Sequence, residues 1–202
     1  GNGSTSSCLT GLFAGPYATT VIDANDCEFP ITSIITDIAG PTVVASVTNN
    51  VSCFGGDEGS AIATSQGGTG SVTYTWLDGA NAIVGNSSLA PNLSVGTYSV
   101  SINDDAGCIA SDIVVINEPA SLAINTSGVD PNCVGSTDGA ASVVVAGGVP
   151  GYTYQWNTFP IGTSATATGL MAGPYLVTIL DANNCPISGG VTSVSYTHLR
   201  AH

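Results

Sequence analysis

The sequence repeats itself at a fixed spacing, and this repeat constrains the fold more than any other feature of the chain. Two segments, 53–59 and 133–139, each carry a cysteine, an acidic residue five positions later and then a glycine. Each segment is followed at the same distances by a Gly-Gly pair and by a Tyr-x-Trp triplet, so that all matched positions lie 80 residues apart. A period of this length indicates a tandem array of small domains.

A second block, Leu-x-x-Gly-x-Tyr followed by Asp-x-x-x-Cys, occurs three times, with its tyrosines at Tyr17, Tyr98 and Tyr175. We therefore expect residues 1–40 to be the C-terminal half of a truncated repeat, 41–119 and 120–194 to be repeat units, and 195–202 to be a tail. The half-unit presents Tyr17 and Val21 on an inward face and has no tryptophan-bearing strand of its own. We expect residues 9–38 to complete their fold with strands from outside the two full units, because an isolated group of about three strands is marginally stable in water.

Apolar and hydroxyl residues alternate within each unit, which is the period of a β-strand with one buried face. Tyr98, Val100 and Ile102, for example, alternate with Thr and Ser. Strands of five to eight residues separated by Gly, Asn, Asp and Pro predict an all-β fold, namely tandem immunoglobulin-like β-sandwich repeats of about 80 residues with about seven strands each. Trp76 and Trp156 are expected in the cores, and the tyrosine of each Leu-x-x-Gly-x-Tyr block is expected to bond the preceding backbone as a tyrosine corner.

The charge balance excludes several classes of function. The chain of 202 residues has 14 Asp plus Glu against one Lys plus Arg, a net charge of −13. It therefore lacks the basic surface that binds nucleic acid or anionic membranes, and we expect neither partner. No apolar run approaches the roughly 20 residues of a membrane span. With carboxylates as the main acid-base groups and no histidine partner for a nucleophile outside the last residues, we expect no catalysis.

The only Arg and both His lie in the last six residues, 197–202. This segment is interpreted either as a genuine terminal strand or as non-native read-through, and we assign no function to its side chains.

The chain contains no Cys-x-x-Cys pair, so disulfides in an oxidising compartment are expected rather than zinc or redox chemistry. A simple pairing stays within each unit, Cys53 with Cys108 and Cys133 with Cys185. Immunoglobulin strand order instead places those loops at opposite ends of a sandwich, some 20 Å apart, whereas a disulfide needs Cα atoms within about 7 Å. That order slightly favours a clamp between consecutive units, Cys53 with Cys185. The clamp would leave Cys27 and Cys133 for units before and after, and Cys8 has no assigned partner.

The combination of Cys-x-x-x-x-(Glu/Asp)-Gly, Gly-Gly, Tyr-x-Trp, Leu-x-x-Gly-x-Tyr and Asp-x-x-x-Cys resembles the SprB-type repeat of very long surface proteins in gliding and biofilm-forming Bacteroidota. The full pattern occurs twice within residues 41–194, and half of it occurs once within residues 9–38. It implies secretion through an outer-membrane route, display at the cell surface as long extracellular fibres, and roles in adhesion or gliding.

Acidic turns are the only candidates for a metal site. Asp23, Asp104, Asp105 and Asp181 could supply oxygen ligands to calcium at a junction between units. The structural alternative is favoured, because Asp in such turns bonds its own backbone two residues further on. We therefore expect no cofactor, with calcium as the alternative. Five Asn-x-Ser/Thr sequons are candidates for glycosylation: Asn2, Asn50, Asn86, Asn92 and Asn125.

Three hypotheses for function follow. The first is a structural and adhesive segment of a secreted cell-surface fibre, with neighbouring repeats of the same fibre, surface glycans or polysaccharide as its partners. The second is an array of carbohydrate-binding modules attached to a secreted enzyme, which needs exposed aromatic side chains such as Tyr152 and Phe159. The third is a self-assembling extracellular filament subunit, completed by strands of a neighbouring chain.

Overall fold

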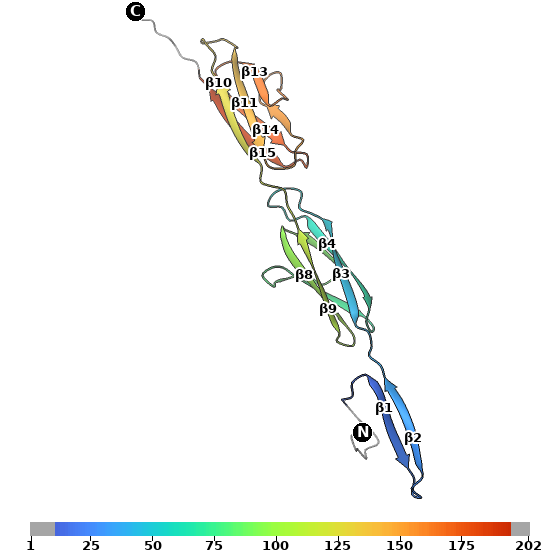
Figure 1. Cartoon of the computed structure of the whole chain (residues 1–202). Helices are drawn as coiled ribbons and strands as arrows, with labels where there is room; N and C mark the ends of the chain where they lie inside the picture. The colour runs from blue at the N-terminus through green and yellow to red at the C-terminus, as the bar shows by residue number, and fades with distance from the viewer. Residues whose placement is uncertain (1–10, 195–202) are drawn as a thin grey trace, which may run out of the picture.

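A computed structural model describes residues 11–194 of the chain. These residues form fifteen β-strands, so the predicted all-β class is confirmed. The strands build a hairpin and two sandwiches that follow one another along the chain (Figure 1). The described part of the chain has no helix that could cross a membrane.

The hairpin consists of β1 (Gly15–Ile22) and β2 (Glu28–Ile35), which pair antiparallel along their whole length. These two strands form a sheet of their own. Val21, Phe29 and Ile34 are each more than half exposed. The hairpin thus keeps an apolar surface that the two sandwiches do not cover, and completion of this half-unit by other strands stays a prediction.

The first sandwich, called unit 1, contains seven strands in two antiparallel sheets. One sheet has the order β3-β4-β7 and the other has the order β6-β5-β8-β9. This arrangement is that of an immunoglobulin-like sandwich, as predicted. The strands are β3 (Pro41–Asn49), β4 (Gly59–Gly67), β5 (Val72–Leu77), β6 (Ile83–Gly85), β7 (Leu89–Leu93), β8 (Gly96–Asp104) and β9 (Ile109–Ile116).

The second sandwich, called unit 2, repeats this arrangement with sheets of order β10-β11-β13 and β12-β14-β15. It has six strands, not the predicted seven, because residues 157–165 form no counterpart of β6. Pro160 in this segment has no N–H for a sheet ladder, and the Trp156 N–H donates directly to the carbonyl of Gly162 across it. The strands are β10 (Ala123–Val129), β11 (Gly139–Ala146), β12 (Thr153–Trp156), β13 (Thr166–Leu170), β14 (Gly173–Leu180) and β15 (Pro186–Ser193).

One tryptophan lies at the centre of each sandwich, as the repeat pattern predicted. Trp76 and Trp156, on the third strand of their units, are fully buried. Each indole N–H donates to a backbone carbonyl, that of Ser87 at 3.0 Å and that of Ser164 at 2.9 Å. The polar atom of the largest core side chain is therefore satisfied in both units, as burial of an indole requires.

The predicted tyrosine corner is present in all three copies of its block. The hydroxyl of Tyr98 donates to the carbonyl of Ser94 at 3.0 Å, four residues upstream. Tyr175 and Tyr17 make the same bond at 2.9 and 2.8 Å. This bond fixes the entry into β8, into β14 and into β1, the strands that lead to the Asp-x-x-x-Cys turns.

We expect the Tyr98→Phe variant to lose about 1 kcal/mol of unfolding free energy from unit 1, the usual net value of one protein hydrogen bond. Urea denaturation followed by tryptophan fluorescence measures the change. Tyr17→Phe is the matched control, because it removes the same bond from the hairpin and should leave the unfolding of unit 1 unchanged. Equal stability of Tyr98→Phe and the parent would show that the corner does not stabilise the unit.

Candidate functional site

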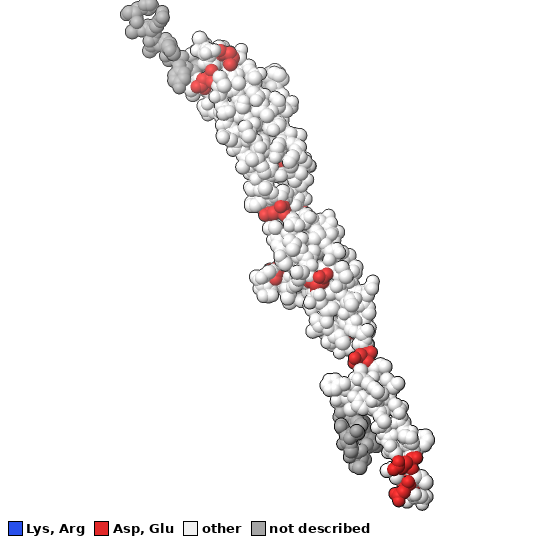
Figure 2. Space-filling model, in the orientation of Figure 1, with Lys and Arg blue, Asp and Glu red and all other residues white. Residues whose placement is uncertain are grey.

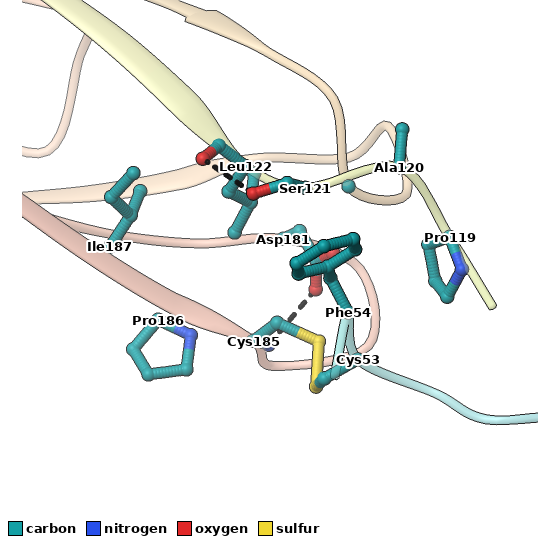
Figure 3. A pocket seen from close by; sticks show the side chains of 11 residues that line it. Cys53, Phe54, Pro119, Ala120, Ser121, Leu122, Asp181, Cys185, Pro186 and Ile187 are labelled. Atoms are coloured by element: carbon teal, nitrogen blue, oxygen red, sulfur yellow. Dashed lines mark hydrogen bonds between the residues drawn. A yellow bond between two sulfur atoms is a disulfide. The ribbon is translucent and has the colours of Figure 1, made fainter. Parts of the chain in front are cut away.

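A disulfide joins the two units. Cys53 lies in the loop between β3 and β4, and Cys185 lies in the turn between β14 and β15, with the two Cα atoms 5.7 Å apart (Figure 3). This is the clamp between consecutive units that immunoglobulin strand order favoured. Their partners in the within-unit pairing, Cys108 and Cys133, are free thiols, as is Cys27. Cys8 lies outside the described residues.

The loop that carries Cys53 is held by its own backbone and by carboxylates. The Gly56 N–H donates to the carbonyl of Cys53 at 3.0 Å, which closes a tight turn. The Ser52 N–H donates to Glu58 at 2.5 Å, and this bond contributes most to lowering the pKa of the Glu58 carboxyl below its usual value. The Gly55 N–H donates to Glu118 at 2.7 Å. Because Glu118 follows β9, the cysteine loop is anchored to the start of the linker between the units.

The turn that carries Cys185 is organised by Asp181, which is almost fully buried. One carboxylate oxygen accepts the N–H groups of Asn183 at 2.8 Å and Cys185 at 2.9 Å, and the other accepts that of Val149 at 2.9 Å. The bond from Val149 is the largest cause that lowers the pKa of Asp181. The same carboxylate thus shapes the cysteine turn and fixes it to the Gly-Gly turn that leads to β12.

This arrangement requires a glycine opposite the carboxylate. Gly148 has φ +61°, in the left-handed region, and a Cβ there would lie 2.7 Å from a carboxylate oxygen of Asp181. Unit 1 repeats the arrangement, since Asp104 accepts the Thr69 N–H at 2.8 Å and a Cβ on Gly68 would lie 3.0 Å from its oxygen. The Gly-Gly pair thus forms a turn in both units, and its second glycine makes room for the aspartate.

The lowered pKa values of Asp104 and Asp181 predict acid sensitivity. A carboxyl whose folded pKa lies below its unfolded value, about 3.9, stabilises the fold above that value and loses this contribution as the pH falls through the folded pKa. We expect stability to fall below about pH 4 for this reason. Asp181→Asn should be less stable than the parent at pH 7 and should lose less further stability on acidification.

Urea titrations from pH 7 to pH 2 in a Trp76→Phe background measure this effect, because Trp156 then reports on unit 2 alone. Asp57→Asn serves as the control, since it removes the same charge from an exposed loop. An Asp181→Asn variant with the full acid sensitivity of the parent would contradict the assignment.

One polar contact across the junction was not predicted from the sequence. The side-chain amide of Asn183 donates to the carbonyl of Ser52 at 2.8 Å, beside the disulfide. The signal for this contact was present in the sequence, because Asn25 occupies the same position in the Cys27 turn. Backbone acceptors such as the Ser52 carbonyl carry no sequence signature, so the pairing became visible only with the fold.

A shallow hollow of about 220 Å³ lies next to the disulfide, between the two units and the linker. Phe54 points into it from the cysteine loop, toward the linker residues Ser121 and Leu122 (Figure 3). The acidic side chains along the described surface lie mainly at the junctions and the ends, with no basic side chain among them (Figure 2). The arrangement serves to join two units covalently and to pack their linker.

The candidate calcium ligands are engaged by backbone N–H groups. Asp23 accepts the N–H groups of Asn25 and Cys27 at 2.7 and 2.9 Å, and the bond from Cys27 contributes most to the lowered pKa of its carboxyl. Asp104 has the equivalent bonds, and Asp105 accepts the Ser71 N–H at 2.8 Å. Among residues 11–194, no three His, Cys, Asp or Glu side chains come together as metal ligands. The hydrogen bonds show that these aspartates organise their turns, and the expectation of no bound calcium stays a prediction.

Four of the five sequon asparagines lie in the described residues, and all four are exposed: Asn50, Asn86, Asn92 and Asn125. The side-chain oxygen of Asn50 accepts the N–H of Asn117 at 2.9 Å, which orders this amide. Asn2 lies outside the described residues. Glycosylation of these positions stays a prediction.

The two aromatic residues considered for carbohydrate stacking differ in their surroundings. Tyr152 packs against the core of unit 2, and its hydroxyl donates to the carbonyl of Gly147 at 2.7 Å. Phe159 is fully exposed. Because Tyr152 is engaged in this way, the pair does not form the exposed platform that a carbohydrate-binding module needs.

Comparison with known proteins gives one family. The model of the SprB repeat matches residues 45–81 and 125–159, one stretch in each unit, so a segment of each unit is similar to the SprB repeat. No curated protein sequence matches the chain.

Among solved structures, the N-terminal eight Ig domains of Down syndrome cell adhesion molecule isoform 1.30.30 are 12% identical over 91% of this chain, with a TM-score of 0.48. This chain spans 28% of that structure. The full ectodomain of mouse nectin-like molecule 4 is 13% identical over 88% of this chain and 72% of its own, with a TM-score of 0.44. The C-terminal fragment of intimin, in complex with a receptor domain, is 14% identical over 78% of this chain and 64% of its own, with a TM-score of 0.40.

Proposed function

We propose that this chain, in which a segment of each unit is similar to the SprB repeat, is a non-catalytic structural and adhesive segment of an extracellular cell-surface fibre. The observation that carries the proposal is the disulfide between Cys53 and Cys185, because it links consecutive units and not the two sheets of one unit. A covalent bond between folded domains serves to transmit load along a chain. Disulfides persist in oxidising surroundings, which supports an extracellular location.

The disulfide gives the two units a second covalent connection beside the linker. The linker runs from Asn117 to Leu122, and its start is fixed to the Cys53 loop through Glu118. Two connections at different points of the same interface restrict both hinge bending and twisting between the units. A fibre built from such pairs resists bending better than one whose domains are joined by a single strand.

The carboxylates support a mechanical role over a catalytic one. Asp104 and Asp181 have lowered pKa values, and both carboxylate oxygens of each accept hydrogen bonds from backbone N–H groups. A general acid must hold a proton near neutral pH, and a carboxyl with a lowered pKa does not. The adhesive part of the proposal rests on the family resemblance. The exposed hydroxyl-rich strands are the surface that would contact a partner.

Protease shaving of intact producing cells tests the proposal. We expect this segment in the shaved fraction, with Cys53 and Cys185 in one disulfide-linked peptide under non-reducing conditions. Cleavage after aromatic or acidic residues is needed, because the chain has no basic residue before its last few positions. Recovery of the segment only after cell lysis, with both cysteines as thiols, would overturn the proposal.

A further inference from the structure

The described residues contain two further cysteine elements of the kinds that form the junction, one loop and one turn. The loop between β10 and β11 carries Cys133, and the turn between β1 and β2 carries Cys27. Both thiols are free and exposed. The two elements lie toward opposite ends of the molecule, the Cys27 turn at the tip of the hairpin and the Cys133 loop at the far end of unit 2 (Figure 1).

The Cys133 loop has the conformation of the Cys53 loop. The Ser136 N–H donates to the carbonyl of Cys133 at 3.1 Å, and the glycine at the third position, Gly135, has φ +83°. The Asn132 N–H donates to Asp138 at 3.1 Å, as the Ser52 N–H donates to Glu58 in the Cys53 loop. The carbonyl and the thiol used at the existing junction are thus presented in the same way at the end of unit 2.

The Cys27 turn matches the Cys185 turn more closely than the Cys108 turn does. Both matching turns read Asp-Ala-Asn-x-Cys, so that Asn25 stands where Asn183 donates across the junction. The Cys108 turn has Ala106 at this position, which carries no amide. Cys108 is also half-buried beside the preceding linker, where a Cβ on Gly40 would lie 3.6 Å from its own Cβ.

We propose that the Cys133 loop of one copy of this chain docks on the Cys27 turn of a second copy and forms a disulfide with it, with Asn25 of the second copy donating to the carbonyl of Asn132. The inference rests on the proposed function and names the partner of its junction, another repeat with an Asp-x-Asn-x-Cys turn. Two thiols lose two protons and two electrons as the S–S bond forms. A low-molecular-weight disulfide such as oxidised glutathione accepts them and leaves as two thiols.

The docking ends carry charge of one sign. Asp23, Asp26 and Glu28 lie in or beside the turn between β1 and β2, and Asp130 and Asp138 lie in the loop between β10 and β11. Figure 2 shows acidic side chains near both ends of the described residues. Like charges slow the approach of two ends, and salt screens them over about 10 Å at 0.1 M. Assembly should therefore be faster at high ionic strength than at low ionic strength.

Oxidation of the purified chain in a glutathione buffer tests the inference, with Cys8→Ser present in every variant. We expect a ladder of covalent oligomers on a non-reducing gel that collapses with reductant, and a Cys27–Cys133 peptide in the digest. Cys27→Ser should leave the chain monomeric, Cys108→Ser should leave the ladder intact, and Asn25→Ala should slow its growth about threefold to tenfold, the effect of one lost hydrogen bond.

A chain that stays monomeric after oxidation, with Cys53–Cys185 formed, would overturn the inference and leave the proposed function standing. A ladder held by Cys133–Cys133 or by Cys108 would overturn it too. Failure of Cys53–Cys185 itself to form is a different result, because it removes the template and the proposed function together.

Discussion

Stretched between Pro41 and Val194, the oxidised pair of units is expected to lengthen very little, even after both units have lost their folds. The load runs from Pro41 to Cys53, across the disulfide, and from Cys185 to the end of unit 2. The disulfide encloses a sequence separation of 132 residues, which never carries the load. At 3.3–3.6 Å per extended residue, reduction releases roughly 440–480 Å of hidden contour length.

Single-molecule force spectroscopy measures this length with and without reductant. Cys53→Ser with Cys185→Ser should behave like the reduced parent under all conditions. Cys108→Ser is the matched control, because it removes a free thiol inside the enclosed segment and should leave the short extension unchanged. Full extension of the oxidised parent would mean that the disulfide does not bridge the load path.

Reduction of Cys53–Cys185 is expected to lower the unfolding free energy of the two units by about 5 kcal/mol, the loop-entropy value for an enclosed segment of 132 residues. The disulfide limits the unfolded chain and leaves the packing of each core untouched. The loss should therefore appear in the midpoint of denaturation, with the tryptophan fluorescence of the native state unchanged.

Guanidinium titrations of the parent with and without reductant check this value, with fluorescence of Trp76 and Trp156 as one reporter in each unit. The Cys53→Ser, Cys185→Ser double variant should match the reduced parent, and Cys133→Ser should match the oxidised one. Identical midpoints for the oxidised and reduced parent would show that the bond does not restrain the unfolded chain.

The features that recur along the sequence were the ones that could be predicted. The buried tryptophans, the tyrosine corners and the Gly-Gly turns each occur at the same place in successive units, and each rests on contacts within a few residues or on strand alternation. The preference for Cys53 with Cys185 followed from strand order, because cysteines at opposite ends of a sandwich meet only across a junction.

The remaining contacts depend on how loops from different units meet, which alternation does not encode. The bond from Asn183 to the Ser52 carbonyl and the bond from the Gly55 N–H to Glu118 each use a backbone group, and backbone groups are identical along the chain. The counterpart of β6 is missing at 157–165, where Pro160 has no N–H for a sheet ladder, and this is a local departure from the repeat.

Non-reducing peptide mapping of the folded, oxidised protein tests the clamp between units most directly. Digestion between the cysteines with chymotrypsin or an acid-specific protease, followed by mass spectrometry, identifies the pair. We predict one linked peptide that contains Cys53 and Cys185, with Cys108 recovered as an alkylated thiol. A linked peptide that contains Cys53 and Cys108 would contradict the account.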